Sequence, residues 1–144
     1  MSKPVTRSIE IDAPVSRVVE VISDLENTDR WANEAKSARV TEHDEHGRPA
    51  KIDVTLGAIG FTTTSTYAVS YTDDAITLTC VAGKLIEEST IAYRIHSRGD
   101  GGSRVEMSST MEVTVPVPRW GLERAMGSSA EKNLASIKKD AEAS

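Results

Sequence analysis

The chain has 144 residues, with 17 Lys and Arg against 22 Asp and Glu, which gives a formal net charge of -5. A chain of this length suits one domain over residues 1–144 and buries roughly 68–70% of its unfolded surface. Because acids and bases are mixed along the sequence and form no basic stripe, we expect neither nucleic acid nor an anionic membrane surface as a partner.

The beginning of the sequence and its cysteine content bear on location. The stretch Met1–Pro4 is polar and lacks the apolar run of a signal peptide or membrane span. Cys80 has no second cysteine with which to form an internal disulfide and is expected as a small buried hydrophobic residue. We therefore expect a cytoplasmic protein without stable membrane insertion.

The first expected elements are a strand and a helix. Apolar residues alternate over Val5–Ile11, with Arg7 as the exception, which predicts a half-buried strand. Pro14 suits the first turn of a helix, with Asp12 or Ala13 as its cap. One apolar face follows at helical spacing, made of Val15, Val18, Val19, Ile22 and Leu25.

A second short helix and a series of strands are expected next. The helix lies around Thr28–Glu34 and carries Trp31. The polar turn His43–Pro49 separates Val40 from the alternating segment Ile52–Leu56 and predicts a hairpin. Short connections make neighbouring strands antiparallel. Four further strands are expected at Gly60–Tyr71, Ala75–Ala82, Leu85–Ser97 and Ser103–Val115.

A long helix is expected at the end of the chain. Pro116 and Pro118 stop the last strand. One apolar face then runs through Leu122, Met126, Ala130, Leu134, Ile137 and Ala141. Such a helix is needed to cover the apolar face of the sheet. The sequence therefore predicts an α+β fold: a seven-stranded antiparallel sheet wrapped around a long C-terminal helix, with two short helices between the first two strands.

A family resemblance is carried by the segment in which the first helix follows the first strand. The pattern Ile11-x-Ala13-Pro14-x-x-x-Val18-x-x-x-Ile22-x-Asp24-Leu25, followed by Trp31, resembles the START-like (SRPBCC) superfamily of polyketide cyclase/dehydrase and lipid-transport proteins. The order of the elements matches from about Val5 to Ala141. The resemblance implies a helix-grip fold with a cavity for a small hydrophobic ligand between the sheet and the C-terminal helix.

Hydroxyl side chains occur on both faces of the expected strand Gly60–Tyr71. Phe61, Thr63, Ser65, Tyr67, Val69 and Tyr71 share one face, and Thr62, Thr64 and Thr66 share the other. A dry core would leave Thr63 and Ser65 without partners, at a cost of roughly 1–3 kcal/mol each. A solvated cavity would satisfy them. The alternative is a strand end that projects beyond the core and is wet on both sides.

The same alternation predicts which residues contact a ligand. Tyr67 and Tyr93 are the best polar candidates, because a buried phenol donates to a carbonyl or hydroxyl; the alternative is a core ring with its hydroxyl at the rim. Met107, Met111 and Met126 are flexible and adapt to varied ligands. The predicted ligand-binding set is Trp31, Val54, Leu56, Phe61, Thr63, Ser65, Tyr67, Val69, Leu78, Cys80, Ile91, Tyr93, Met107, Ser109, Met111, Trp120, Leu122, Met126 and Ala130.

The charged residues of the sixth expected strand are poor catalytic candidates. Arg94 and His96 have the parity opposite to Tyr93, which places them on the solvent face. Glu87 and Glu88 straddle the two faces, so that one of them either points inward or forms a carboxylate at the rim. We expect the rim position and predict no catalytic residue here.

Two further features have a functional and a structural interpretation. Trp31 and Trp120 either gate the mouth of a cavity or pin their helices. The segment His43–His46 has His-x-x-His spacing, but it lies in a turn, whereas the helical zinc motif places its histidines at i and i+4. We therefore expect no metal site and no cofactor.

Three hypotheses for function follow. The first is a carrier or sensor for a lipid, quinone, isoprenoid or polyketide-like molecule. The second is a polyketide cyclase/aromatase or dehydrase that uses pocket tyrosines, as the resemblance implies for some relatives. The third is a protein-interaction module that uses the outer sheet face or the last helix. Of these we expect the ligand-binding protein, and the identity of a protein partner is not predicted.

Overall fold

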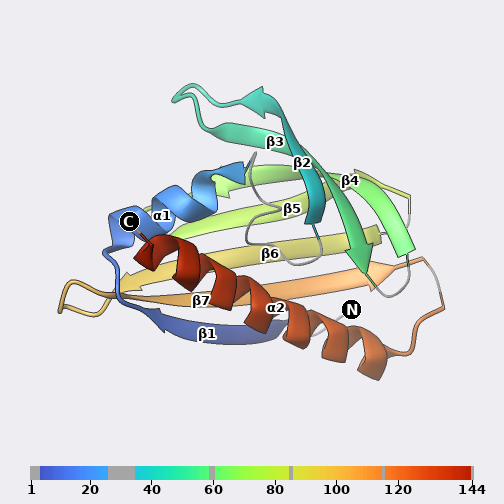
Figure 1. Ribbon diagram of the computed structural model, residues 1–144. Helices are drawn as coiled ribbons and strands as arrows, with labels where there is room; N and C mark the ends of the chain where they lie inside the picture. Colours follow the sequence, from blue (N-terminus) through green and yellow to red (C-terminus); the bar gives the residue numbers. More distant parts are fainter. Residues whose placement is uncertain (1–3, 26–34, 59–60, 85, 115, 144) are drawn as a thin grey trace.

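The computed structural model describes residues 4–25, 35–58, 61–84, 86–114 and 116–143, with the backbone alone at 35–36, 56–58 and 61. These residues form a seven-stranded antiparallel sheet, a short helix α1 (Val15–Ser23) and a long helix α2 (Arg119–Glu142) (Figure 1). The strands are β1 (Val5–Ile11), β2 (Ala35–His43), β3 (Pro49–Ala58), β4 (Phe61–Tyr71), β5 (Ala75–Gly83), β6 (Ile86–Ser97) and β7 (Ser103–Val113).

The sheet is built from successive hairpins. Its strand order is β1-β7-β6-β5-β4-β3-β2, so each strand from β2 to β7 pairs with its neighbour in the chain and β1 pairs with β7. The turn between β6 and β7 contains Gly99 and Gly101, both at a φ of 87°, where side chains with a Cβ are strained. The predicted architecture, a seven-stranded antiparallel sheet with a long C-terminal helix, is confirmed.

One face of the sheet, called the inner face below, packs against the two helices. Along β7, Val105 and Met107 are buried in the same hydrophobic cluster as Ile137 of α2 and Ile22 of α1, while Arg104 points outward and is exposed. The strict period of two explains why the faces could be predicted.

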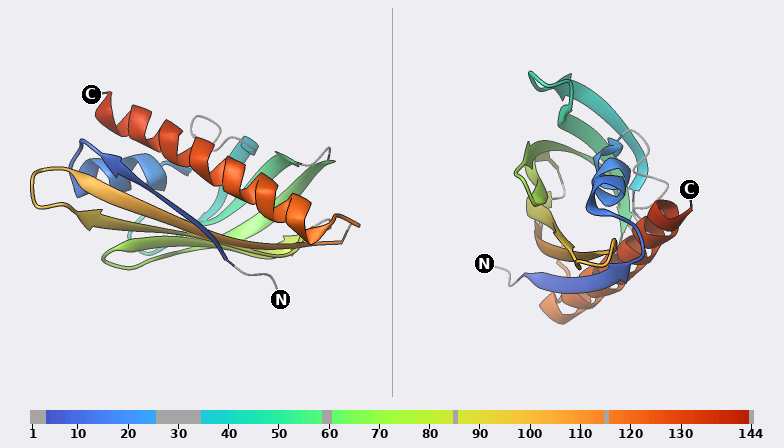
Figure 2. Two further views of the ribbon diagram at one scale, coloured as in Figure 1. Left: turned by 90° about the horizontal axis from the view of Figure 1, so that it is seen from below. Right: turned by 90° about the vertical axis from the view of Figure 1, so that its left-hand side faces the viewer.

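Helix α2 packs mainly on β1, meets α1 near the C-terminal end of α2, and contacts β7 less extensively (Figure 2). Arg17 of α1 joins the two helices, because its Nη2 donates to the backbone oxygen of Asp140 at 3.1 Å. The buried residues of α2 include small and polar side chains as well as apolar ones: Leu122, Met126, Gly127, Ser129, Ala130, Asn133, Leu134, Ile137 and Ala141.

The entry into α1 differs from the expected one. Neither Asp12 nor Ala13 caps the helix; Pro14 is itself the N-cap, and its carbonyl oxygen accepts from the Arg17 and Val18 amides at 3.0 and 3.2 Å. Asp12 instead binds Arg98, which is distant in the sequence. The second expected helix, Thr28–Glu34, lies outside the described residues.

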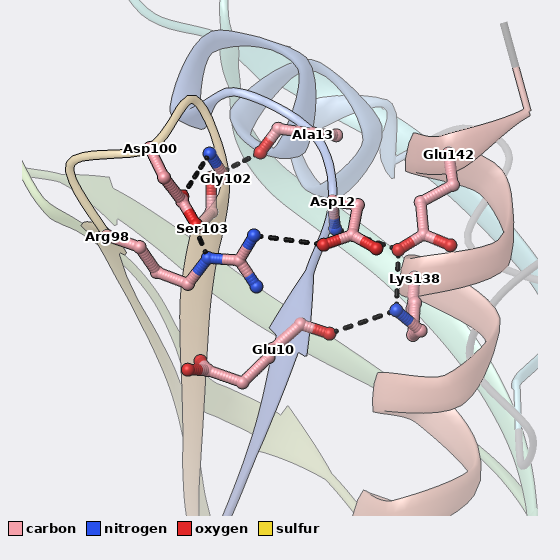
Figure 3. Close-up of polar contacts among 9 residues, drawn as sticks. All are labelled: Glu10, Asp12, Ala13, Arg98, Asp100, Gly102, Ser103, Lys138 and Glu142. Carbon is pink, nitrogen blue, oxygen red and sulfur yellow. Dashed lines mark hydrogen bonds and ion pairs between the residues drawn. The ribbon is translucent and has the colours of Figure 1, made fainter.

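A polar cluster ties the C-terminal end of α2 to the rest of the fold (Figure 3). Lys138 Nζ donates to the Glu10 carbonyl oxygen at 3.1 Å and to Glu142 at 2.5 Å. Glu142 also accepts from the Asp12 amide at 2.8 Å, and Arg98 lies 2.9 Å from the Asp12 carboxylate. These contacts, called the C-terminal polar cluster below, fix one end of the helix over β1 and the β6–β7 turn.

Candidate functional site

The inner face of β4 carries the hydroxyl groups expected of it. Ser65 and Tyr67 are 1% and 2% exposed, Val69 is buried beside them, and Thr63 is half-buried. Two of the outward hydroxyls are paired across the strands: the Thr64 and Thr55 hydroxyls lie 2.9 Å apart, and Thr66 donates to Asp53 at 2.7 Å. The predicted division of this strand into two hydroxyl-bearing faces is therefore confirmed.

Ser65 differs from its neighbours because its hydroxyl has no hydrogen-bond partner among the described atoms, although it is fully buried. It pairs across the strands with Val54 of β3 and Gly83 of β5. The side chain at the first of these positions is apolar, and the second has none. This is the unsatisfied hydroxyl that the strand pattern predicted for a dry inner face.

Tyr67 is held by a second buried serine. Its hydroxyl donates to Ser89 Oγ on β6 at 3.1 Å, and Ser89 is 1% exposed. Ser89 was missing from the predicted set, although the alternation that selects Ile91 and Tyr93 also selects it. Ser65, Tyr67 and Ser89 thus place three buried hydroxyls on the inner face.

A β-bulge determines what faces inward at the start of β6. The register shifts between Ile86 and Glu88, and Ile86 is 6% exposed whereas Glu87 and Glu88 are both exposed. The extra residue of a bulge turns the following side chains, so neither carboxylate enters the interior. The rim position expected for these two residues agrees with the structure.

The N-terminal half of α2 differs in composition from its C-terminal half. Leu122 and Met126 are buried but are not part of the main hydrophobic cluster, which includes Ala130 and the later apolar residues of the helix. Ser129 and Asn133, at i+3 and i+7 from Met126, are buried as well and were not predicted. Their helical spacing from Met126 was the signal that pointed to them.

The other predicted ligand-binding residues fall into three groups. Val54, Leu78, Tyr93 and Met107 are buried in the main cluster, with Cys80 and Ile91 packed against it. Ser109 is buried and Met111 is half-buried on β7. Trp31 and the side chains of Leu56 and Phe61 lie outside the described residues. The structure thus brings most of the set to one face, and their contact with a ligand stays a prediction.

Trp120 does not pack into the fold. It lies in the first turn of α2 and is 70% exposed, so it does not pin the helix through burial. A gating role for this residue stays a prediction.

Charge is kept away from the buried part of the described chain. The buried polar residues there are serines and Asn133, and no Asp, Glu, Lys, Arg or His is among them. Arg94 and His96 are exposed on the outer face, as expected. Burial raises the pKa of Tyr71, which donates to the Pro49 carbonyl oxygen at 2.7 Å, so its phenol stays neutral. The site offers neutral donors and acceptors.

The described residues lack both a metal-binding cluster and a membrane-spanning helix. They contain no group of three or more His, Cys, Asp or Glu side chains placed to hold a metal ion. None of the helices described is both long and apolar enough to cross a membrane.

The fold and the sequence identify the family. Residues 3–142 match the model of the family described as polyketide cyclase / dehydrase and lipid transport, and the chain belongs to this family. The predicted resemblance is thereby confirmed. No curated protein sequence matches the chain.

Solved structures share the fold at low sequence identity. A START superfamily protein from Mycobacterium smegmatis is 20% identical, with a TM-score of 0.88 over 96% of this chain and 97% of that one. A protein from Thermus thermophilus is also 20% identical, with a TM-score of 0.83 and the same coverage of 96% and 97%. The Zhui aromatase/cyclase from a Streptomyces species is 12% identical, with a TM-score of 0.85 over 99% and 94%.

Proposed function

We propose that this protein binds a small hydrophobic or amphipathic molecule, such as a lipid, quinone, isoprenoid or polyketide-like compound, between the inner face of the sheet and α2. It acts as a cytoplasmic carrier or sensor. The observation that carries the proposal is the inner face itself, where buried hydroxyls lie among apolar side chains and the Ser65 hydroxyl has no partner in the described part of the chain. An amphipathic ligand matches both kinds of surface.

Ligand binding to the folded state raises thermal stability by mass action. Protein freed of ligand by unfolding and refolding is mixed with a panel of long-chain alcohols, quinones and aromatic ketones, and its Tm is measured. A ligand at a hundred times its Kd adds about 2.7 kcal/mol. For a chain of this size, that corresponds to a Tm increase of roughly 5–10 °C.

Native mass spectrometry of the untreated and refolded protein provides the control, because it shows whether a small molecule remains bound. A panel without any Tm increase, on protein shown to be free of ligand, contradicts the proposal.

A second candidate, a polyketide cyclase or dehydrase, is favoured by the hydrogen bond between Tyr67 and Ser89. The serine fixes the position of a buried phenol, which would act as a general acid once its proton turned from Ser89 to a substrate oxygen. The fold shared with the Zhui aromatase/cyclase is compatible with this chemistry. Turnover of a poly-β-ketone that is lost in Tyr67→Phe or Tyr93→Phe, while affinity is retained, would establish it; binding without turnover in the unmodified protein would favour the carrier.

A further inference from the structure

We propose that the Ser65 hydroxyl, beside the side-chain-free position of Gly83, is the anchor for an uncharged oxygen of the ligand. The inference rests on the proposed function and deepens it by naming a ligand class: hydrophobic molecules that carry a ketone, ester, ether or hydroxyl oxygen. Carboxylates and phosphate esters are excluded from this site.

The first argument is that Ser65 alone among three fully buried serines lacks a partner. Ser89 accepts from Tyr67, and Ser103 Oγ donates to the Ala13 carbonyl oxygen at 2.6 Å. Ser65 has the same degree of burial, but its Oγ has no partner among the described atoms. A buried hydroxyl without a partner destabilises a protein, so its presence is explained if a ligand supplies the partner.

The second argument is the glycine beside this hydroxyl. A Cβ placed on Gly83 would lie 2.6 Å from Ser65 Oγ, closer than real Cβ contacts allow. Glycine at position 83 therefore lets the Ser65 hydroxyl keep its place on the inner face.

The backbone does not require glycine at this position. Among the described glycines, the positive φ values belong to Gly47, Gly99 and Gly101, and not to Gly83. Gly83 is exposed, so the hydroxyl adjoins backbone that solvent reaches. The absent side chain therefore matters because the Ser65 hydroxyl occupies the room that it leaves.

The third argument concerns charge. No Lys, Arg or His side chain is wholly buried among the described residues. Arg17, whose Nε is buried, is engaged by Glu20 and the Asp140 carbonyl oxygen, so an anionic group placed next to Ser65 would have no free counter-ion. Arg7 shares the inner-face parity, but it lies on β1, at the opposite edge of the sheet, and pairs with Glu131 at 3.6 Å. An uncharged oxygen satisfies Ser65 without this penalty.

The test uses three probes that share one ring: naphthalene, acetylnaphthalene and naphthoate. Their Kd values are measured by fluorescence titration at neutral pH for the ligand-free protein and its variants. Acetylnaphthalene is expected to bind at least tenfold more tightly than naphthoate. Ser65→Ala should weaken acetylnaphthalene about five- to tenfold and leave naphthalene unchanged.

Gly83→Ala and Ser70→Ala complete the design. Gly83→Ala places a methyl group against the Ser65 hydroxyl, which must then move, and it should reduce the affinity for acetylnaphthalene to that for naphthalene. Ser70→Ala is the matched control, because Ser70 lies on the same strand, faces outward and is exposed. It should change none of the three Kd values. Circular dichroism verifies that each variant is folded.

The outcomes separate this inference from the proposed function. Binding of all three probes with equal affinity in Ser65→Ala and the unmodified protein overturns the anchor and leaves ligand binding intact. Tighter binding of naphthoate than of acetylnaphthalene overturns the choice of an uncharged oxygen. Failure of all three probes to bind overturns both proposals.

Discussion

Two buried serines on the same face of the sheet have opposite environments. Ser103, at the start of β7, donates to the Ala13 carbonyl oxygen, which joins the sheet to the segment that enters α1. Ser65, in the middle of β4, is equally buried and has no partner among the described atoms. The two positions have the same residue type and the same burial, so the difference between them lies in what surrounds each hydroxyl.

The surroundings indicate different roles for the two regions. Around Ser103, most polar groups of the C-terminal polar cluster and the β6–β7 turn are paired internally, as in Gly102, whose amide donates to Asp100 at 2.9 Å. Arg17, which also bonds the end of α2, is the exception, because its Nε is buried without a partner among the described atoms. Around Ser65, a buried hydroxyl without a partner among the described atoms lies within an apolar face. Proteins tend to leave buried polar groups without hydrogen-bond partners at the sites where they bind ligands. We therefore propose that the first region contributes to stability and that the second binds the ligand.

The largest expected effect contrasts the two halves of α2. Ile137 is fully buried in the main hydrophobic cluster, so Ile137→Ala should lower the free energy of unfolding by about 2–5 kcal/mol. Met126 is buried outside that cluster, so Met126→Ala should cost less and weaken ligand binding instead. Urea denaturation and probe titration measure both. Equal losses of stability with unchanged binding would contradict the assignment.

The next effect is at Ser103. Ser103→Ala removes the donor to the Ala13 carbonyl oxygen and leaves a buried acceptor unsatisfied. We expect a loss of about 1–3 kcal/mol in urea denaturation, with unchanged affinity for probe ligands. A variant as stable as the unmodified protein would show that this hydrogen bond does not secure the entry to α1.

The matching substitution at Ser65 should behave differently. Ser65→Ala removes a buried hydroxyl that has no partner among the described atoms. Its free energy of unfolding should be unchanged or higher by up to about 1 kcal/mol. The same denaturation experiment on ligand-free protein measures this. A loss as large as that of Ser103→Ala would mean that Ser65 is satisfied in solution and that the two regions do not differ.

The smallest effect is a pH dependence in the C-terminal polar cluster. The hydrogen bond from Lys138, together with that from the Asp12 amide, lowers the pKa of Glu142. A lowered native pKa contributes stability that is present above the ordinary carboxyl pKa and is lost as the pH falls through the native value. The unmodified protein should thus have a slightly higher Tm than Glu142→Gln at neutral pH, and this difference should vanish in acid. An advantage that persists in acid would contradict the ionic contribution.

The sequence predicted the strands and their faces because these depend on local periodicity. The alternation that places Tyr67 and Tyr93 inward holds over each strand, and it would also have identified Ser89. The environment of Ser65 could not be predicted in the same way. It depends on which residue lies opposite, and the pairing with Gly83 precedes a register shift between Thr66 and Tyr67.

Two other features could not be predicted from the sequence, because they also depend on pairing between distant residues. The inward turn of Ile86 depends on a bulge in its pairing with β7, which leaves no clear signal in the sequence. The pairing of Asp12 with Arg98 joins positions far apart in the chain. Local capping rules, which consider neighbouring residues alone, therefore predicted Asp12 as a possible helix cap, and this was wrong.

The most direct test of ligand binding on the inner face is an NMR titration of the ligand-free protein with acetylnaphthalene, following the backbone amide shifts. We expect the largest shifts at Ser65, Gly83 and Ser89, and little change around Ser103. Shifts confined to the exposed surface near Trp120, or spread evenly over the protein, would contradict the account.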